Sequence, residues 1–403
     1  MRLFYSVFIH FFGFFMQFIG IFNQKTKNWC TVRQNWEIDL SQKIKPNVKH
    51  VWIHCASAGE FEQAIPIINN LRLTMNDSKI CVSFFSSSGF DMYKDSDLAD
   101  VFFYFPSDTK TNAEKLVKIL QPNLVIFIRN EIWLNILSEL EEKKIPTFLV
   151  NANLQHERNF FYQLFLQKAY PLFTKIFDTK TFGNTKLQRV CENKSVEFKN
   201  EVFEDFCKDS FVIILGSSWL VEDALIALFY KKYCLKYPNL KIIIAPHEYD
   251  KKRKDEIVKL FTDWQTPNIN EVISYSKYSI LNTQYSILIL DEKGILKYAY
   301  RYADIAFIGG GFDKGVHNIT EAAVYGIPTV FGNNYHKFEE VKELIHLDVA
   351  FPVNNYTELE QKLIELINNS EKRNGIKDKL DSYFSLQENV AKNIIAEISN
   401  AIR

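Results

Sequence analysis

Glycine is scarce in this sequence, and the glycine signatures of two large nucleotide-binding classes are missing. The chain has 14 Gly in 403 residues, with no G-x-G-x-x-G and no G-x-x-x-x-G-K-[ST] run. A dinucleotide fingerprint and a P-loop are therefore disfavoured. Net charge is absent as well, because 48 Lys and Arg balance 48 Asp and Glu. That balance disfavours a nucleic-acid-binding protein with a strongly basic surface.

The cysteines form no recognisable disulfide framework or zinc site. All six stand far apart, at positions 30, 55, 81, 191, 207 and 234, with no C-x-x-C pair. This spacing is typical of reduced thiols in a cytosolic catalytic part. His50 and His54 share one face of a predicted strand, but no carboxylate accompanies them at ligand spacing. We therefore interpret them as core or strand-end histidines and assign no metal.

Aromatic residues are abundant, and they concentrate at the start of the chain. Eight of the 35 Phe lie within the first 22 residues, and positions 3–24 contain no Lys, Arg, Asp or Glu. That length suffices to span a bilayer core of about 30 Å. Less apolar residues recur at spacings of 4, 3, 4, 3 and 4, namely Ser6, His10, Gly13, Gln17, Gly20 and Gln24. They form one stripe on a predicted helix.

A striped helix of this kind fits two positions at a membrane. It either lies in the interface with the stripe toward protein or water, or spans the bilayer with the stripe packed on a neighbour. A buried helix of a soluble protein is the alternative. The residues that follow favour the membrane, since they are typical of interfacial anchors. These are Trp29 and Trp36, beside Lys25, Lys27 and Arg33.

Apolar runs that end in small or polar turns recur along the rest of the chain in two series. Such continuous runs are typical of strands in a parallel sheet covered on both faces. The fold class is therefore α/β, with two doubly wound halves that divide near residue 205 and face a ligand-binding cleft. A terminal amphipathic helix is expected at 390–402. The predicted strands are 50–55, 79–85, 124–128 and 147–150, then 211–215, 241–245, 286–290, 305–308 and 329–331.

A run of three glycines, Gly309 to Gly311, follows one of the predicted strands. Asn318 is a favourable N-cap for the helix that comes next, and Glu321 stands three residues later, as in a capping box. Free N–H groups in a first helical turn attract a phosphate, and glycines let a ligand approach the backbone. The segment thus predicts a phosphate site, with an ordinary capped helix as the alternative.

Two glutamates follow predicted strands of the first half. Glu60 comes after small residues at the end of the first strand. A carboxylate there, opposite a phosphate site, can take a proton from an attacking hydroxyl. Its alternative role is only to stabilise a helix N-terminus. Glu131 occupies the equivalent place after another strand, and a plain ion pair with Arg129 or Arg158 is the alternative for it.

Short motifs spread over nearly the whole chain share one resemblance. Together they resemble the 3-deoxy-D-manno-octulosonic acid (Kdo) transferases, membrane-associated GT-B glycosyltransferases of lipopolysaccharide assembly. The aromatic N-terminal helix and the N-Q-K-T-K segment after it fit this family too. In order, the motifs are W-I-H-C-A-S-A-G-E (52–60), E-I-W-L-N (131–135), G-S-S-W (216–219), A-P-H (245–247), A-D-I-A-F-I-G-G-G (303–311) and H-N-I-T-E (317–321).

The resemblance implies a GT-B fold, in which two Rossmann-like domains face a cleft, together with an N-terminal membrane-associated helix. It implies inverting transfer of Kdo from CMP-Kdo to a lipid A precursor, with no metal or other cofactor, on the cytoplasmic face of the inner membrane. Nucleic acid is not an implied partner. Glu60 would be the general base, and Glu131 is a further catalytic candidate. Contacts with CMP or substrate would come from Ser217, Pro246, His247, Lys293, Gly294, Ile295, Gly310, Asn318, Ile319, Thr320 and Glu321.

Four domains are expected on this basis. The N-terminal helix and linker occupy 1–40, an acceptor-binding domain 41–205, and a CMP-sugar-binding domain 206–380. The terminal helix at 381–403 is expected to pack back toward the N-terminal domain.

Three departures from the family pattern occur. Leu134 replaces the usual Pro, Arg129 stands in place of a first Glu, and Lys293-Gly294-Ile295 replaces an M-G-E-like turn.

Two other functions stay open at this point. One is a GT-B enzyme that uses a UDP- or GDP-sugar, and the other is a catalytically silent membrane scaffold.

Overall fold

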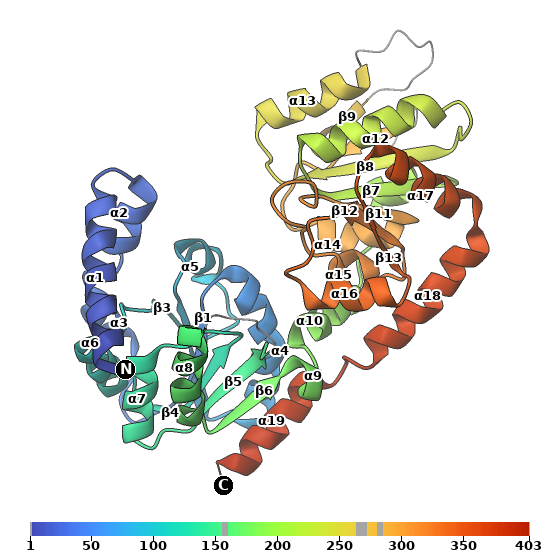
Figure 1. The fold of residues 1–403 in the computed structure, drawn as a ribbon. Coiled ribbons are helices and arrows are strands. Elements are labelled where there is room, and N and C mark those ends of the chain that lie inside the picture. Colours follow the sequence, from blue (N-terminus) through green and yellow to red (C-terminus); the bar gives the residue numbers. More distant parts are fainter. Residues whose placement is uncertain (1, 155–159, 263–271, 280–284, 403) are drawn as a thin grey trace. The chain divides into compact units, whose positions relative to one another are not determined.

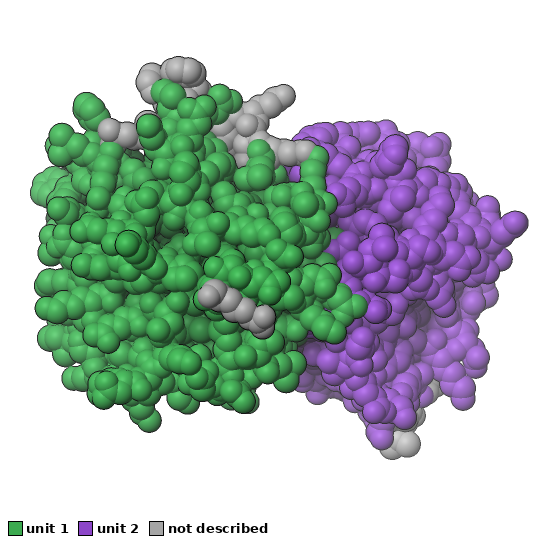
Figure 2. Space-filling model, turned by 90° about the horizontal axis from the view of Figure 1, so that it is seen from below, with its two compact units in different colours: residues 1–189, 389–403 green, residues 190–388 purple. Residues whose placement is uncertain are grey.

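The chain forms two compact units in a computed structural model that describes residues 2–154, 160–262, 272–279 and 285–402. Unit 1 consists of Met1–Arg189 together with Asn389–Arg403, and unit 2 consists of Val190–Glu388. Figure 2 shows the two units in different colours. Helix α10 (Thr185–Ser195) contains the point at which the chain passes from the first unit to the second.

A six-stranded parallel sheet forms the centre of unit 1, with the order β3-β2-β1-β4-β5-β6. This order is that of a doubly wound Rossmann-like sheet, whose direction of winding reverses between β1 and β4. Ligands of such sheets bind at the carboxyl ends of the strands beside this reversal. The strands are β1 (Lys49–Cys55), β2 (Ser78–Phe84), β3 (Val101–Tyr104), β4 (Pro122–Ile128), β5 (Thr147–Ala152) and β6 (Lys175–Asp178).

Helices cover both faces of this sheet because successive strand residues point to opposite sides. On β1, Val51 and Ile53 enter one core and Trp52 enters the other. The first core lies under α4 (Ala58–Thr74) and α19 (Val390–Ala401), and the second under α3 (Trp36–Lys43), α6 (Lys110–Leu120) and α7 (Leu134–Glu142). Further helices of the unit include α5 (Ser87–Tyr93), α8 (Phe160–Ala169) and α9 (Thr179–Phe182).

The N-terminal residues form a helical hairpin, α1 (Arg2–Gly20) and α2 (Gln24–Thr31), whose two helices lie side by side (Figure 1). Asn23 caps α2 by accepting a hydrogen bond from the Thr26 N–H. A Cβ added at Gly20 would lie 3.3 Å from the Lys27 backbone, so glycine permits this close approach. Within the described residues, α1 is the one helix long and apolar enough to cross a membrane.

Unit 2 contains a seven-stranded parallel sheet in the order β13-β12-β11-β7-β8-β10-β9. Its winding reverses between β7 and β11. The strands are β7 (Phe211–Ser218), β8 (Leu240–Pro246), β9 (Val272–Ser274), β10 (Ile287–Ile289), β11 (Ile305–Ile308), β12 (Thr329–Gly332) and β13 (Ala350–Val353). Its helices include α11 (Glu201–Cys207), α12 (Leu220–Tyr233), α13 (Lys251–Thr262), α14 (Leu296–Ala299), α15 (Thr320–Ala323), α16 (Glu339–His346), α17 (Tyr356–Asn368) and α18 (Ser370–Ser385).

The α/β fold class with two doubly wound parallel sheets is confirmed, whereas the boundaries of the units differ from the predicted positions. The chain divides at 189/190 rather than near 205. Residues 201–207 belong to unit 2 because Phe203 of α11 stacks on Tyr275 and Tyr302. At the other end, α18 extends to Ser385, and the segment that packs into unit 1 is α19.

Candidate active site

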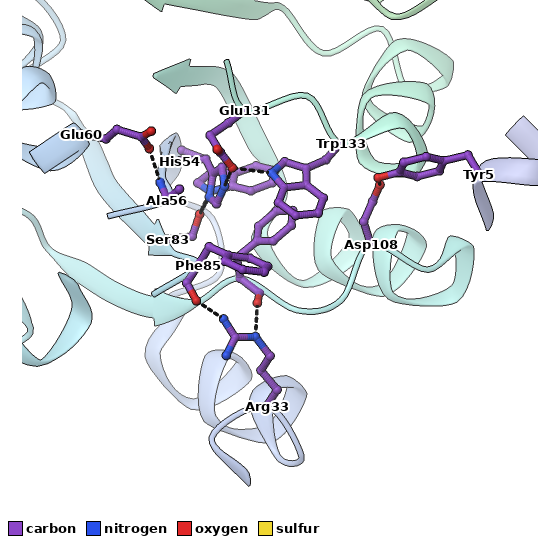
Figure 3. A network of polar contacts seen from close by, with 12 residues as sticks. Tyr5, Arg33, His54, Ala56, Glu60, Ser83, Phe85, Asp108, Glu131 and Trp133 are labelled. Atoms are coloured by element: carbon purple, nitrogen blue, oxygen red, sulfur yellow. Dashed lines mark hydrogen bonds and ion pairs between the residues drawn. The ribbon is translucent and has the colours of Figure 1, made fainter. Parts of the chain in front are cut away.

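Glu60 lies in the first turn of α4, directly after β1. Ser57 is the N-cap of α4, and the Glu60 carboxylate turns back to accept a hydrogen bond from the Ala56 N–H at 2.5 Å (Figure 3). Burial raises the pKa of Glu60 to about 7, and the charge of Glu131 adds to the rise. The Ala56 N–H and the charge of Arg129 act in the opposite direction. Glu60 therefore titrates near neutral pH.

Glu131 lies on the loop between β4 and α7. Its Oε2 is 2.9 Å from the Trp133 indole Nε1, which donates to it, and 3.3 Å from His54 Nε2. The side chain is 18% exposed. Strands β1 and β4 are paired, so Glu60 and Glu131 follow the two strands at which the winding of the sheet reverses. The structure thus brings the two predicted glutamates to the place where such sheets bind ligands.

His54 is a part of this site that sequence reasoning missed. It is fully buried at the end of β1, as expected of a core histidine, yet its two ring nitrogens contact Glu131 and the Ser83 hydroxyl. The Ser83 oxygen also accepts a hydrogen bond from the Trp52 indole at 2.8 Å. These contacts fix the His54 ring, and the ring in turn holds Glu131. The W-I-H run was the available signal, since period-two alternation places Trp52 and His54 on one face.

Aromatic rings surround the Glu131 contacts. The Trp133 ring stacks on Phe85, with centroids 5.3 Å apart, and packs against Phe105 at 5.1 Å. Phe105 also packs on the His54 ring at 4.3 Å. Phe85 and Phe105 follow β2 and β3, so residues from four strand ends meet around Glu131 (Figure 3).

Glu131 does not bond to Arg129, one of the two arginines that were alternatives as its ion-pair partner. Arg129 is exposed and has a φ of 65°, and its charge acts on Glu60. The polar contacts of Glu131 are with His54 and Trp133 instead. Arg158 lies outside the described residues.

Helix α1 is tied to the start of α7, close in sequence to Glu131. The Tyr5 hydroxyl donates to the Asp108 carboxylate at 2.7 Å, and the Ser6 hydroxyl donates to the Asn135 side chain at 3.0 Å. Asp108 also accepts from the backbone N–H groups of Asn135 and Ile136, which begin α7. Burial raises the pKa of Asp108 to about 7. The last residue of the E-I-W-L-N motif therefore anchors the N-terminal helix.

Two of the predicted interfacial anchors were assigned wrongly. Trp36 is 9% exposed and packs in the core of unit 1, and Arg33 is 8% exposed. The Arg33 guanidinium donates to the backbone oxygens of Phe85 and Phe105 (Figure 3). Trp36 faces the protein because α3 packs on the edge strand β3, and Arg33 because its acceptors directly follow β2 and β3. The local sequence does not reveal these contacts.

In unit 2, the predicted donor-binding residues lie at the ends of four neighbouring strands or on the loops after them. Ser217 is the second-last residue of β7, Pro246 is the last residue of β8 and His247 follows it, residues 293–295 follow β10, and residues 310 and 318–321 follow β11. These strands are adjacent in the order β11-β7-β8-β10. Because parallel strands place their carboxyl ends at one edge of a sheet, the four loops share that edge.

A stack of rings lies at this edge. His247 stacks on Trp219, with centroids 4.5 Å apart, and on His317 at 4.7 Å. The Trp219 indole donates to His317 Nε2 at 3.1 Å, and Lys314 Nζ lies 3.4 Å from the Trp219 ring centroid. Burial lowers the pKa of both histidines, and the charge of Lys314 lowers both further. Both pKa shifts favour the neutral imidazole. Trp219 and His317 belong to the sequence motifs, but the sequence predicts no role for them. Lys314 is not among the predicted binding residues.

The glycine run does not leave an open backbone as predicted. The Gly310 N–H donates to the buried Glu222 carboxylate at 2.8 Å, and the Trp219 N–H donates to the same group at 3.0 Å. A Cβ at Gly309 would lie 2.3 Å from the Ser217 oxygen, and one at Gly311 2.5 Å from the Gly332 nitrogen. Glycine is required here because neighbouring loops pack closely on one another. The Gly310 N–H already donates a hydrogen bond to Glu222 and is not free for a phosphate.

The predicted N-cap at Asn318 is also wrong. Helix α15 begins at Thr320 and is only four residues long, and no side chain caps it. The Asn318 side chain instead donates to Glu321 at 3.0 Å and accepts from the Thr320 hydroxyl at 2.6 Å. Ile319 and Thr320 are buried, so their side chains are not presented to solvent. By contrast, Lys293 and Gly294 are exposed, and Gly294 has a φ of 85° with open space around its Cα.

No cluster of three or more His, Cys, Asp or Glu side chains suited to a metal ion occurs in the part of the chain that the structure describes. The free cysteines are Cys30, Cys55, Cys81, Cys191, Cys207 and Cys234.

Solved structures with the same two-unit architecture define the class of fold. A putative UDP-N-acetylglucosamine 2-epimerase from Listeria monocytogenes superposes with a TM-score of 0.61 at 11% identity, over 87% of this chain and 96% of that one. MurG from Acinetobacter baumannii gives a TM-score of 0.54 at 15% identity, over 87% and 99%. At such low identity these likenesses show the GT-B-like fold alone.

Sequence comparisons show which proteins the chain is similar to. The profile described as 3-deoxy-D-manno-octulosonic-acid transferase (kdotransferase) matches residues 31–196. The Kdo transferase of Aquifex aeolicus is 28% identical, over 79% of this chain and 86% of its own length. Those of Haemophilus influenzae and Rickettsia felis are 24% and 26% identical, over 81% and 88% of this chain and 81% and 80% of their own lengths. The chain is thus similar to Kdo transferases over most of its length, in agreement with the resemblance of its motifs, and it is a glycosyltransferase.

Proposed function

We propose that this glycosyltransferase moves Kdo from CMP-Kdo to a lipid A precursor with inversion at the anomeric carbon, and that Glu60 is the general base. The observation that carries the proposal is the place of Glu60, in the first turn of α4 directly after β1 at the reversal of the sheet, where burial raises its pKa from 4.5 to about 7. A base with a pKa near the working pH is both ionised and basic enough to accept a proton in the transition state. Similarity to the Kdo transferases supports the choice of the sugar and of a lipid A precursor as its acceptor.

The proposed reaction is a single displacement. The acceptor hydroxyl gives its proton to the Glu60 carboxylate while its oxygen forms a bond to the anomeric carbon of Kdo. The bond from that carbon to the phosphate oxygen breaks, and CMP leaves with the electron pair. Glu131 contributes its charge, which keeps Glu60 basic, and His54 and Trp133 hold Glu131 in place.

CMP binds to unit 2 in this proposal. The ring stack of Trp219, His247 and His317 offers aromatic surface, and the Asn318 to Glu321 segment offers polar groups. Lys314 is exposed beside Trp219 and supplies a positive charge for the phosphate. Side chains and backbone N–H groups can stabilise a leaving phosphate without a metal ion. The proposal therefore includes no metal cofactor.

Glu60→Gln tests the base. Kdo transfer from CMP-Kdo to a lipid A precursor is followed by mass spectrometry of the lipid. We expect kcat to fall by about 10²–10⁴-fold, the contribution of a positioned base, with unchanged affinity for CMP. Glu62→Gln is the matched control, because Glu62 lies on the same helix but bonds to Tyr93 and Arg189. Near-normal transfer by Glu60→Gln would remove the base assignment.

Nucleotide competition tests the donor. CMP should inhibit the transfer and raise the melting temperature of the wild-type chain, whereas UDP and GDP should do neither at the same concentration. Protection by UDP or GDP but not by CMP would replace the Kdo donor by another nucleotide sugar. Binding of CMP without any transfer would favour a silent scaffold.

Helix α1 lies in the membrane interface in this proposal, on the cytoplasmic face of the inner membrane. One side of the helix contacts the protein through Tyr5, Ser6 and Phe12. The other side exposes a row of large apolar side chains, which an interfacial helix buries among the headgroups. These are Leu3, Phe4, Val7, Phe8, Phe11, Phe14, Phe15 and Phe18, continued by Ile21 and Phe22 after the helix ends.

Replacing Phe8, Phe11 and Phe15 by Ser tests this anchor by flotation with vesicles that contain anionic lipid. If each ring is partly buried in the membrane and contributes about 1 kcal/mol, loss of the three rings should lower the partition constant about 100-fold. Three exposed leucines elsewhere, changed to Ser together, are the control: Leu73, Leu235 and Leu386. Equal flotation of both variants and the wild type would show that another surface binds the membrane.

A further inference from the structure

Arg33 is a buried cation that has no carboxylate partner among the residues that the structure describes. It follows α2 and is 8% exposed. Its guanidinium donates to three backbone oxygens: Trp29 at 2.9 Å, Phe105 at 2.9 Å, and Phe85. No ion pair involves Arg33 within the described ranges, and the groups that act on its charge are Tyr104 and Cys30.

Such a burial is costly and needs compensation. Loss of water around the guanidinium lowers the pKa of Arg33 to about 9, so the group still carries its charge at neutral pH. Charge-assisted hydrogen bonds to carbonyl oxygens offset part of the desolvation. Aromatic rings add cation–π attraction: the guanidinium carbon lies 4.0 Å from the Trp29 ring, 5.2 Å from Phe85 and 5.4 Å from Tyr104. A planar, three-way clamp of this kind fixes the loops that supply its acceptors.

The two loops that Arg33 joins lead to Glu131. Phe85 and Phe105 provide the carbonyl oxygens, and their rings contact Trp133. Phe105 also contacts the His54 ring. Trp133 and His54 are the polar partners of Glu131.

The same clamp connects the N-terminal hairpin to the site. Phe12 of α1 packs on Trp29 of α2 with centroids 6.2 Å apart, and Trp29 packs on Phe85 at 5.4 Å. Rings thus form a continuous path from the proposed membrane helix to Trp133.

We propose that Arg33 is a positioning residue for glycosyl transfer. By clamping the chain at Phe85 and Phe105, it holds the rings that keep Glu131 close enough to act on Glu60. This role rests on the proposed function of Glu60 as the base. It also links the hairpin that binds the membrane to the residues that carry out transfer, although Arg33 touches no substrate.

Arg33→Met in the full chain, assayed with vesicles, tests the role. We expect kcat to fall by about ten- to a hundredfold, the effect of a displaced catalytic group, with the KM for CMP-Kdo unchanged because unit 2 is untouched. The acid limb of the pH–rate profile should move to lower pH, since a displaced Glu131 raises the pKa of Glu60 less. Arg33→Lys should recover part of the rate, because an ammonium keeps the charge but not the planar fork.

Lys43→Met is the matched control. Lys43 also donates to a carbonyl oxygen of the same sheet edge, that of Phe102 at 2.9 Å, but its contacts do not lead to Glu131. This variant should keep the wild-type kcat and pH profile. Equal losses in both variants would mean that Arg33 only stabilises the unit, and wild-type kinetics in Arg33→Met would overturn the proposal directly.

Hydrogen exchange separates this role from the identity of the substrate. Amides of residues 129–137 should exchange faster in Arg33→Met than in the wild type, while those of unit 2 should not change. If the wild type fails to transfer Kdo but this local loosening occurs, the positioning role stands and the proposed function fails. If Arg33→Met does not fold, Phe85→Leu replaces it, since this change removes the ring on Trp133 but keeps the carbonyl oxygen. A folded Phe85→Leu with wild-type kcat and an unmoved acid limb would overturn the proposal.

Discussion

Replacing Glu131 by glutamine should lower the pH at which the enzyme loses activity in acid. Glu60 must be ionised to accept a proton, so the rate falls as the pH drops through its pKa of about 7. The negative charge of Glu131 is the second cause of that raised pKa, after burial. Glutamine keeps the shape of the side chain and a hydrogen-bond acceptor for Trp133, but it removes the charge.

The size of the effect follows from the pKa of Glu60. It lies about 2.5 units above the ordinary value of 4.5. Burial is the larger contribution and persists in the variant, so we expect the acid limb to move down by on the order of one unit, about 1.4 kcal/mol. The limb should stay above pH 4.5, because Glu60 remains buried.

The assay is the pH dependence of kcat/KM for the lipid acceptor between pH 5 and 9, at a fixed concentration of CMP-Kdo. Glu62→Gln serves again as the control, since Glu62 is not among the groups that shift the pKa of Glu60. An acid limb that stays near pH 7 in Glu131→Gln would refute electrostatic coupling of the two carboxylates. A limb that moves to higher pH would show that Glu131 acts in another way.

Three further outcomes are expected. Because its folded-state pKa is raised, Glu60 destabilises the fold increasingly as the pH rises from 4.5 through about 7. Glu60→Gln should therefore be more stable than the wild type by about 3 kcal/mol at pH 8 but by less than about 1 kcal/mol near pH 5. Urea unfolding measures this, and equal stability at both pH values would contradict the burial of the ionised group. Lys314→Met should weaken CMP binding about tenfold in calorimetry, while Lys342→Met, which removes a lysine paired with Glu339 on α16, should not. Prolonged EDTA treatment should leave Kdo transfer unchanged, and loss of activity restored by one divalent cation would show that a metal takes part.

Much of the fold was predictable because most strands are continuous apolar runs. The strands that were missed are short or interrupted. β3 has four residues and β9 has three. β6 carries Lys175 and Asp178, and β13 contains Pro352. Both of these are edge strands, where charges and proline are tolerated because one side of the strand needs no partner.

The two candidate glutamates were predictable because parallel strands place the residues that follow them at one edge. Other parts of the site depend on contacts that no local pattern contains. Arg33 meets its acceptors 52 and 72 residues further along the chain, and its neighbours Lys25 and Lys27 make the segment look like a basic membrane flank. At the glycine run, the sequence predicts a backbone that is open to a ligand. In the structure, the Gly310 N–H donates instead to the Glu222 carboxylate, 88 residues away in the sequence.

The division of unit 1 into two separate stretches of sequence has a consequence for how the protein folds during synthesis. Val390, Ile394 and Ile398 of α19 complete a core that contains Phe61 and Ile65 of α4. The ribosome makes all of unit 2 between these two sets of residues. Unit 2 is contiguous and can fold as it emerges, whereas unit 1 begins first and must wait with one face of its sheet incompletely covered. The unit whose residues leave the ribosome first is therefore the unit that is finished last.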